Sequence, residues 1–120
     1  MPTGGGALKV LRRSDVPSKG TEGEVREYYF FDGFDEVELI ITHVPPQFRQ
    51  EMHGHRLVNE IHYVIKGQIV AIEGESEVLL KEGDSVLFEK GHLHTVENLS
   101  GETSIVLTIK QPRLEDKYNG

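Results

Sequence analysis

Five of the six histidines of this chain fall into two short segments. The segment HGHRLVNEIH contains His53, His55 and Glu60, and the segment GHLHTVEN contains His94. Imidazole nitrogens and carboxylate oxygens bind divalent transition metals. Residues two apart on an extended segment point to the same side, so His53 and His55 can face one centre, to which Glu60 returns if the chain bends. With His94 brought in from elsewhere in the fold, the pattern predicts one metal site built from two halves.

The expected ligand set of three histidines and one glutamate favours one divalent transition metal ion per chain, namely Fe, Mn, Ni, Co, Zn or Cu. Calcium and magnesium are poor candidates because both prefer oxygen ligands. The chain has no cysteine, which excludes thiolate ligands and a cysteine nucleophile. An octahedral ion held by four protein ligands keeps two adjacent positions open. A substrate with neighbouring oxygens, or a substrate together with dioxygen, would fill them.

Length and charge restrict the remaining possibilities. The 120 residues suffice for one domain, and the formal net charge is -7, with 20 acidic against 13 basic residues. A chain without a clustered cationic surface is a poor partner for nucleic acid or for an anionic membrane. It contains no apolar run of about 20 residues, and its start does not resemble a signal peptide. We therefore expect a cytoplasmic protein that binds a small-molecule substrate.

Glycine recurs about every 8–10 residues between short stretches rich in Val, Ile, Leu and Phe. Regular turn signals between such stretches predict an all-β sandwich or barrel. The compact β domain is expected over 25–111, after an N-terminal arm at 1–24 that starts with Gly4-Gly5-Gly6 and before a frayed tail at 112–120. The expected strands cover residues 25–31, 36–44, 60–65, 68–73, 76–81, 85–88 and 103–110.

Alternation along 60–65 separates polar from apolar side chains. Glu60 and His62 share one face, which we place inside the barrel mouth, and Ile61, Tyr63 and Ile65 share the other. An apolar outer face must be covered, by the N-terminal arm or by a second subunit. We therefore expect a homodimer, with the arm as part of its interface.

The first histidine segment resembles the first motif of the cupin family. That motif is His-x-His, three or four residues, Glu, six residues and Gly, which His53, His55, Glu60 and Gly67 match. The following EIHYVIKG is similar to the family's Glu-x-x-Tyr-Val-Leu-x-Gly ending. The resemblance extends over roughly residues 36–110.

The second cupin motif matches at every position except one. Gly83, Gly91, His94 and Asn98 stand at the expected spacing, and Glu89 replaces the motif's proline. That proline is a turn residue and no ligand, so the departure barely affects the metal assignment. The resemblance implies a double-stranded β-helix, or jelly roll, with a metal near one mouth. The ligand positions of the two motifs carry over to His53, His55, Glu60 and His94.

Three functions are compatible with this pattern. The first is a metal-dependent oxidative enzyme of dioxygenase type. The second is a non-redox isomerase, epimerase or lyase that acts on a sugar or keto acid, with His62 or Glu97 as its base. The third is a non-enzymatic module that binds a small molecule or metal. His62 is the candidate catalytic residue, and the roles of His43, His92 and Arg49 stay open.

Overall fold

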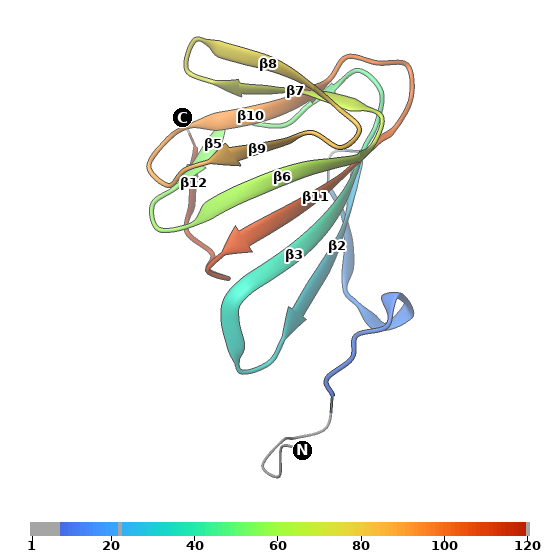
Figure 1. Cartoon of the computed structure of the whole chain (residues 1–120), viewed down its shortest axis with the longest axis vertical. Coiled ribbons are helices and arrows are strands. Elements are labelled where there is room, and N and C mark those ends of the chain that lie inside the picture. The colour runs from blue at the N-terminus through green and yellow to red at the C-terminus, as the bar shows by residue number, and fades with distance from the viewer. Residues whose placement is uncertain (1–7, 22, 120) are drawn as a thin grey trace.

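The computed structural model describes residues 8–21 and 23–119, which form two antiparallel β-sheets and one short 3-10 turn, Arg13–Asp15 (Figure 1). The glycine run at 4–6 lies outside the described residues. Sheet A contains, in spatial order, β1 (Ser18–Thr21), β2 (Glu24–Phe31), β3 (Phe34–Val44), β11 (Ser104–Gln111), β6 (Asn59–Lys66) and β9 (Ser85–Phe88). Sheet B contains β12 (Lys117–Asn119), β5 (His53–His55), β10 (His94–Asn98), β7 (Gln68–Glu73) and β8 (Ser76–Lys81), and β4 (Phe48–Arg49) pairs with β10.

The all-β prediction is confirmed, and each of the seven expected strands is present within one or two residues at either end. The glycines expected at turns, Gly67, Gly83 and Gly91, all have positive φ, a conformation that glycine adopts without strain. The expectation of a frayed tail is wrong, because residues 117–119 form β12 and pair with β5. Within residues 8–21 and 23–119, no helix is long and apolar enough to cross a membrane.

The interior between the sheets has an apolar part and a polar part. On β6 the inward side changes from Glu60 and His62 to Val64, and on β11 it changes from Lys110 and Thr108 to Val106. The polar side chains therefore gather at one end, while the apolar ones pack together at the other. Each buried Val or Leu contributes about 1.5–3 kcal/mol to holding the sheets together. This core consists of Val44, Val64, Ile69, Ala71, Leu80, Phe88, Val96 and Val106.

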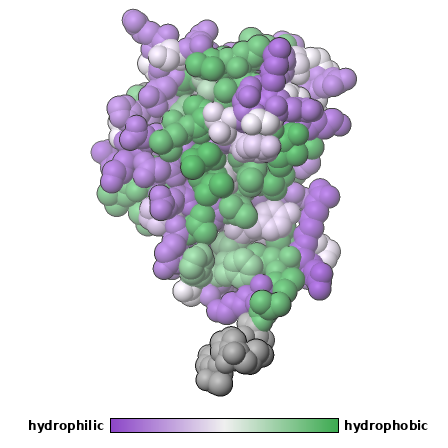
Figure 2. Space-filling model, viewed as in Figure 1, coloured by the Kyte–Doolittle hydropathy of each residue, from purple (hydrophilic) through white to green (hydrophobic). Residues whose placement is uncertain are grey.

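The outer face of sheet A is apolar and partly exposed. Ile61, Tyr63 and Ile65 on β6 are each more than 40% exposed, as is Leu87 on β9. Figure 2 shows a band of hydrophobic residues over the strands of this sheet. The described part of the arm lies at the far edge of the sheet, where β1 pairs with β2. These residues of the arm therefore leave the face around β6 exposed.

Candidate metal centre

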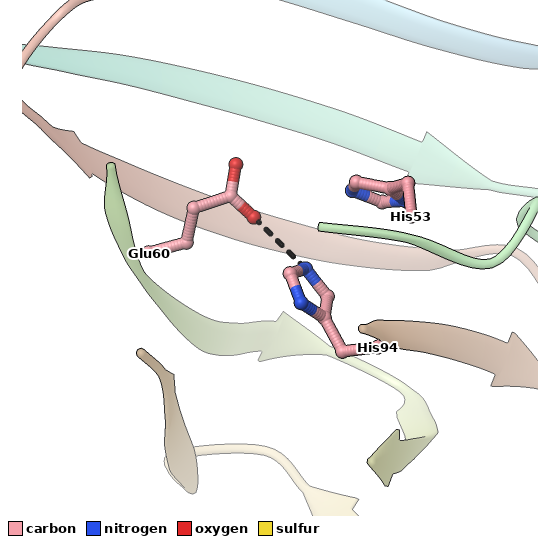
Figure 3. Close-up of side chains that lie close together, drawn as sticks. All are labelled: His53, Glu60 and His94. Atoms are coloured by element: carbon pink, nitrogen blue, oxygen red, sulfur yellow. Dashed lines mark ion pairs between the residues drawn. The ribbon is translucent and has the colours of Figure 1, made fainter. Parts of the chain in front are cut away.

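Three strands bring the predicted ligands to the polar end of the interior. His53 and His55 lie on β5, Glu60 on β6 and His94 on β10, and the strands pair such that His94 lies opposite His53. One donor atom each from His53, Glu60 and His94 falls within 4.8 Å of the other two. Figure 3 shows these three side chains directed toward one another. This group could hold a metal ion.

His55 approaches the same carboxylate from the other end of β5. Its Nε2 lies 3.1 Å from Glu60 Oε2, while His94 Nε2 lies 3.4 Å from Glu60 Oε1. All four side chains are buried. The structure therefore places three of the four predicted residues in one group and puts His55 beside Glu60, the carboxylate of that group.

The orientation of each histidine ring is fixed through its Nδ1 atom. Nδ1 of His53 donates to the Glu51 carbonyl at 2.9 Å, and Nδ1 of His94 donates to the His92 carbonyl at 3.2 Å. Nδ1 of His55 lies 2.7 Å from the Asp116 carboxylate. A carbonyl or an ionised carboxylate only accepts, so Nδ1 carries the proton and Nε2 keeps its lone pair in each neutral ring. Such contacts orient histidine ligands in metal sites.

Asp116 belongs to this cluster, although no motif of the sequence predicts it. It precedes β12, and its second oxygen, Oδ2, accepts the backbone N–H of Leu57 at 2.7 Å, which holds the carboxylate in place. Tyr118 packs on Gly54, where an added Cβ would lie 2.9 Å from the tyrosine ring. Strand β12 thus packs directly on the segment that carries both histidines. A lone aspartate 61 residues after His55 has no spacing signal that would identify it.

The site is electrostatically prepared for a cation. Burial lowers the pKa of His53 to about 4, so its imidazole is neutral at pH 7. Burial is the largest influence on Glu60 and raises its pKa, but the surrounding histidines, of which His62 donates to Oε1, outweigh burial and hold that pKa well below the usual range. Burial also lowers the pKa of His55, but the carboxylates of Glu60 and Asp116 raise it above its ordinary value. A proton at His55 therefore competes with a metal ion.

The donor set fits a divalent ion. Nε2 of His55 and Nε2 of His94 are buried and make no hydrogen bond with any residue in the described part of the chain. A lone pair that faces an ionised carboxylate across 3.1–3.4 Å is unfavourable unless a positive charge lies between them. A cation among these nitrogens and the Glu60 oxygens removes that repulsion and satisfies the orphaned atoms.

Comparison with known proteins identifies the family of the chain. The family model described as "Cupin domain" matches residues 40–110, more than half of the sequence. The protein is a cupin. The resemblance carried by the two histidine motifs is therefore confirmed.

Solved structures support the double-stranded β-helix. KdgF from Halomonas sp. superposes on this cupin with a TM-score of 0.78 at 16% identity, over 88% of this chain and 96% of that chain. The polyketide cyclase RemF from Streptomyces resistomycificus has a TM-score of 0.77 at 21% identity, over 94% and 85%. A predicted oxalate decarboxylase from Thermotoga maritima has a TM-score of 0.70 at 20% identity, over 87% and 99%. A likeness at such identities shows a common fold and leaves the reaction open.

His62 lies beside the four predicted ligands of this cupin. Its Nε2 is 3.2 Å from Glu60 Oε1 and donates to that ionised oxygen, which leaves Nδ1 as the bare nitrogen. Nδ1 is buried and has no hydrogen-bond partner among residues 8–21 and 23–119. The His94 ring stacks on Phe88 at 4.0 Å between centroids, and His62 meets the edge of the same ring at 5.1 Å. Phe88 thus forms an apolar floor under the polar cluster.

The space next to these residues is small. A cavity of about 40 Å3 is lined by His53, Glu60 and His62, together with Arg26, Ile40, Thr42, Gln50 and Thr108. A second cavity of about 90 Å3 shares Arg26, Gln50 and His53 with the first. Larger hollows of about 540 and 570 Å3 lie elsewhere, the first against Ile61 and Leu87 on the outer face of sheet A. The titratable and metal-binding groups place the site in the two small cavities rather than in the large hollows.

Four other residues weighed from the sequence lie outside this cluster. His43 is half-buried on β3, 3.9 Å from Glu27. Arg49 is exposed, and Glu97 lies three residues after His94 on β10, so it points to the opposite face, where Arg49 is 3.9 Å away. Glu97 is therefore not positioned as a base. His92 is exposed and contributes to the site only its backbone carbonyl.

Proposed function

We propose that this cupin is a metal-dependent enzyme that acts on a small molecule, with one divalent transition metal ion held by His53, His55, Glu60 and His94. The observation that supports this is the common arrangement of the three histidines. Each ring is anchored through Nδ1, which leaves Nε2 as the nitrogen available to the centre next to Glu60. A merely structural cluster would leave these buried atoms unsatisfied.

When bound, the ion would act as a Lewis acid that polarises a carbonyl oxygen or stabilises the charge of an enolate. The chain's own residues supply orientation and proton transfer. Glu60 is held by the Nε2 proton of His62, which fixes the carboxylate on the side of the histidines. Phe88 and the buried walls exclude bulk water from this end of the barrel, which strengthens the interactions of charged groups there.

His62 favours a non-redox reaction. Its bare Nδ1 belongs to a residue that lines the cavity, so it can accept a proton from a carbon next to a carbonyl and return it elsewhere. The product is then a rearranged or cleaved sugar or keto acid, as formed by an isomerase, epimerase or lyase. The names of similar structures, a polyketide cyclase and a predicted oxalate decarboxylase, show that related folds carry different reactions.

A dioxygenase is the second candidate. The same four residues would hold the ion, which would then supply redox chemistry for a substrate that binds beside it. Oxygen consumption together with iron or another redox metal supports this candidate, whereas zinc with no oxygen consumption supports the non-redox reaction. If the protein binds metal and small molecules but converts none of them, it is a binding module rather than an enzyme.

Elemental analysis of protein purified without added metal or a metal-affinity tag tests the proposal. We expect close to one transition metal ion per chain in the wild type and a severe loss in the variants Glu60→Gln and His94→Ala, with circular dichroism unchanged. His43→Gln is the matched control, because that histidine lies outside the cluster. Full occupancy in Glu60→Gln or His94→Ala removes that residue from the ligand set, and a wild type without metal overturns the proposal.

A further inference from the structure

Arg26 places a permanent positive charge in the wall of the site. It lies on β2, and its side chain is 28% exposed. Together with Gln50 and His53 it lines both the cavity next to Glu60 and the neighbouring cavity of about 90 Å3. A molecule that occupies both spaces therefore contacts the guanidinium and the histidine cluster at the same time.

One edge of this guanidinium is anchored and another donor is free. An NH2 group of Arg26 donates to Glu24 Oε1 at 2.9 Å, and Gln50 donates to Glu24 Oε2 at 2.6 Å. Glu24 is only 3% exposed, so the pair is held rigidly in the wall. Nε of Arg26 is also buried, but it has no hydrogen-bond partner among the residues described. An unsatisfied buried N–H group is rare in a folded protein and calls for a ligand or a water.

The charges of the site favour an anion. A divalent ion with three neutral imidazoles and Glu60 leaves about one net positive charge. Arg26 and Glu24 neutralise each other, and in the neighbouring cavity the charge of Lys117 is matched by that of Glu51, so the excess positive charge is that of the metal centre. A hydroxyl of a neutral sugar could accept from Nε but would leave the excess charge uncompensated, whereas a carboxylate accepts from Nε and also balances the charge. Guanidinium groups also match carboxylate geometry better than ammonium groups do.

We infer that the substrate is a small organic acid and that Arg26 binds its carboxylate while a second oxygen-bearing group faces the histidine cluster. This inference rests on the proposed function and names its substrate class. Arg26 acts here as a specificity-determining residue, and it takes no part in proton transfer.

Calorimetric titration of manganese-loaded protein with two probes tests this assignment. Glycolate offers a hydroxyl and one carboxylate for chelation, and hydroxymalonate adds a second carboxylate to the same group. We expect hydroxymalonate to bind the wild type about 10- to 100-fold more tightly, as a charged hydrogen bond predicts. The double variant Glu24→Gln with Arg26→Gln removes both charges of the pair, and we expect it to bind the two probes equally.

Manganese content distinguishes the possible failures. A wild type that holds no ion overturns the metal centre and this inference with it. A wild type that holds manganese and shows no preference for hydroxymalonate overturns the role of Arg26 alone, and so does a double variant that keeps the preference. If the double variant does not fold, Arg26→Lys serves instead, because it keeps the charge and removes Nε. If Arg26→Lys prefers hydroxymalonate over glycolate as strongly as the wild type does, the assignment is contradicted as well.

Discussion

The Asp116 carboxylate lies 2.7 Å from Nδ1 of His55, and this contact joins the C-terminal part of the chain to the predicted metal centre. The second oxygen of Asp116 accepts the Leu57 N–H, so the aspartate is fixed on both sides. A carboxylate in this position keeps the proton of His55 on Nδ1 and makes Nε2 more basic. His55 therefore depends on a residue of the tail for its orientation as a ligand.

Asp116→Asn should weaken metal binding by about 10- to 100-fold, the usual effect of removing a partner that orients a histidine ligand. An amide can present its NH2 group to Nδ1, which would place the His55 proton on Nε2, where it blocks the metal. Titration of metal-free protein with Zn²⁺ in the presence of a competing chelator measures the change. Glu115→Gln is the matched control, because Glu115 is exposed and adjacent. Equal zinc affinity in Asp116→Asn and the wild type would show that Asp116 is dispensable.

Gly54→Ala should disturb both the tail and the metal site. The new Cβ would lie 2.9 Å from the Tyr118 ring and 3.0 Å from the His92 carbonyl oxygen, so strand β12 must move. We expect a loss of about 1–3 kcal/mol in the free energy of unfolding, measured with urea, together with weaker zinc binding. Gly101→Ala is the control, because nothing lies within 4 Å of its added Cβ. Adding Tyr118→Ala to Gly54→Ala should restore part of the stability, and unchanged stability in Gly54→Ala would contradict the described packing.

The metal-free protein should lose stability as the pH falls. Burial lowers the pKa of His53 from 6.5 to about 4 in the folded chain. The unfolded chain therefore takes up this proton first, and the free energy of unfolding decreases between about pH 6.5 and pH 4, by about 2 kcal/mol for this group. His55 acts in the opposite sense, because its pKa is raised in the folded chain. Its contribution to the free energy of unfolding is fully present below pH 6.5 and is lost as the pH rises through the raised pKa of the folded chain.

The variant His53→Gln isolates the His53 contribution to this pH dependence. The measurement is urea unfolding with a chelator present, carried out between pH 4.5 and 6.5. This pH interval lies at or above the ordinary pKa of 4.5 for glutamate. The wild type should lose more stability than His53→Gln over this interval. Parallel curves for the two proteins would mean that His53 is not held neutral by burial.

We propose that a second copy of the chain covers the outer face of sheet A. The side chains of Leu39, Ile109, Ile61 and Leu87 form one row across β3, β11, β6 and β9. This row is partly exposed, and the described residues of the arm do not cover it. Because a two-fold interface joins the same patch on both subunits, a continuous apolar row suits a homodimer.

Ile61→Glu should convert the dimer into monomers, because it places two charges at the centre of the interface. Sedimentation should give twice the chain mass of 13.5 kDa for the wild type and a single chain mass for the variant. Val78→Glu is the matched control, since Val78 is similarly exposed but lies on β8 of sheet B. A wild type that sediments as a monomer contradicts the proposed interface.

Regular alternation and spaced glycines made most of the fold predictable. Glu60, His62 and Val64 do point inward, and Ile61, Tyr63 and Ile65 do point outward. Strand β10 was missed because His94 to Asn98 follows a turn and contains only one aliphatic residue, Val96. Tertiary packing rather than local sequence makes this segment a strand, since all its residues except Glu97 are buried.

The predicted ligands could be found because their spacing is short and their chemistry is rare. Asp116 and Arg26 could not be found in this way, because aspartate and arginine are common on surfaces and neither lies near a histidine in the sequence. Only the register of β2 and the docking of β12 bring them to the site. The tail was expected to fray because RLEDKYNG is polar, yet Tyr118 and Asp116 give it two specific contacts.

Asp116 follows His55 by 61 positions, which also sets the order in which these residues appear during protein synthesis. All four predicted ligands leave the ribosome before Asp116 does. Before Asp116 is in place, no carboxylate holds the His55 proton on Nδ1, so either ring nitrogen could be offered to an ion. Docking of β12 against β5 is therefore the step that would leave Nε2 alone to face the predicted centre.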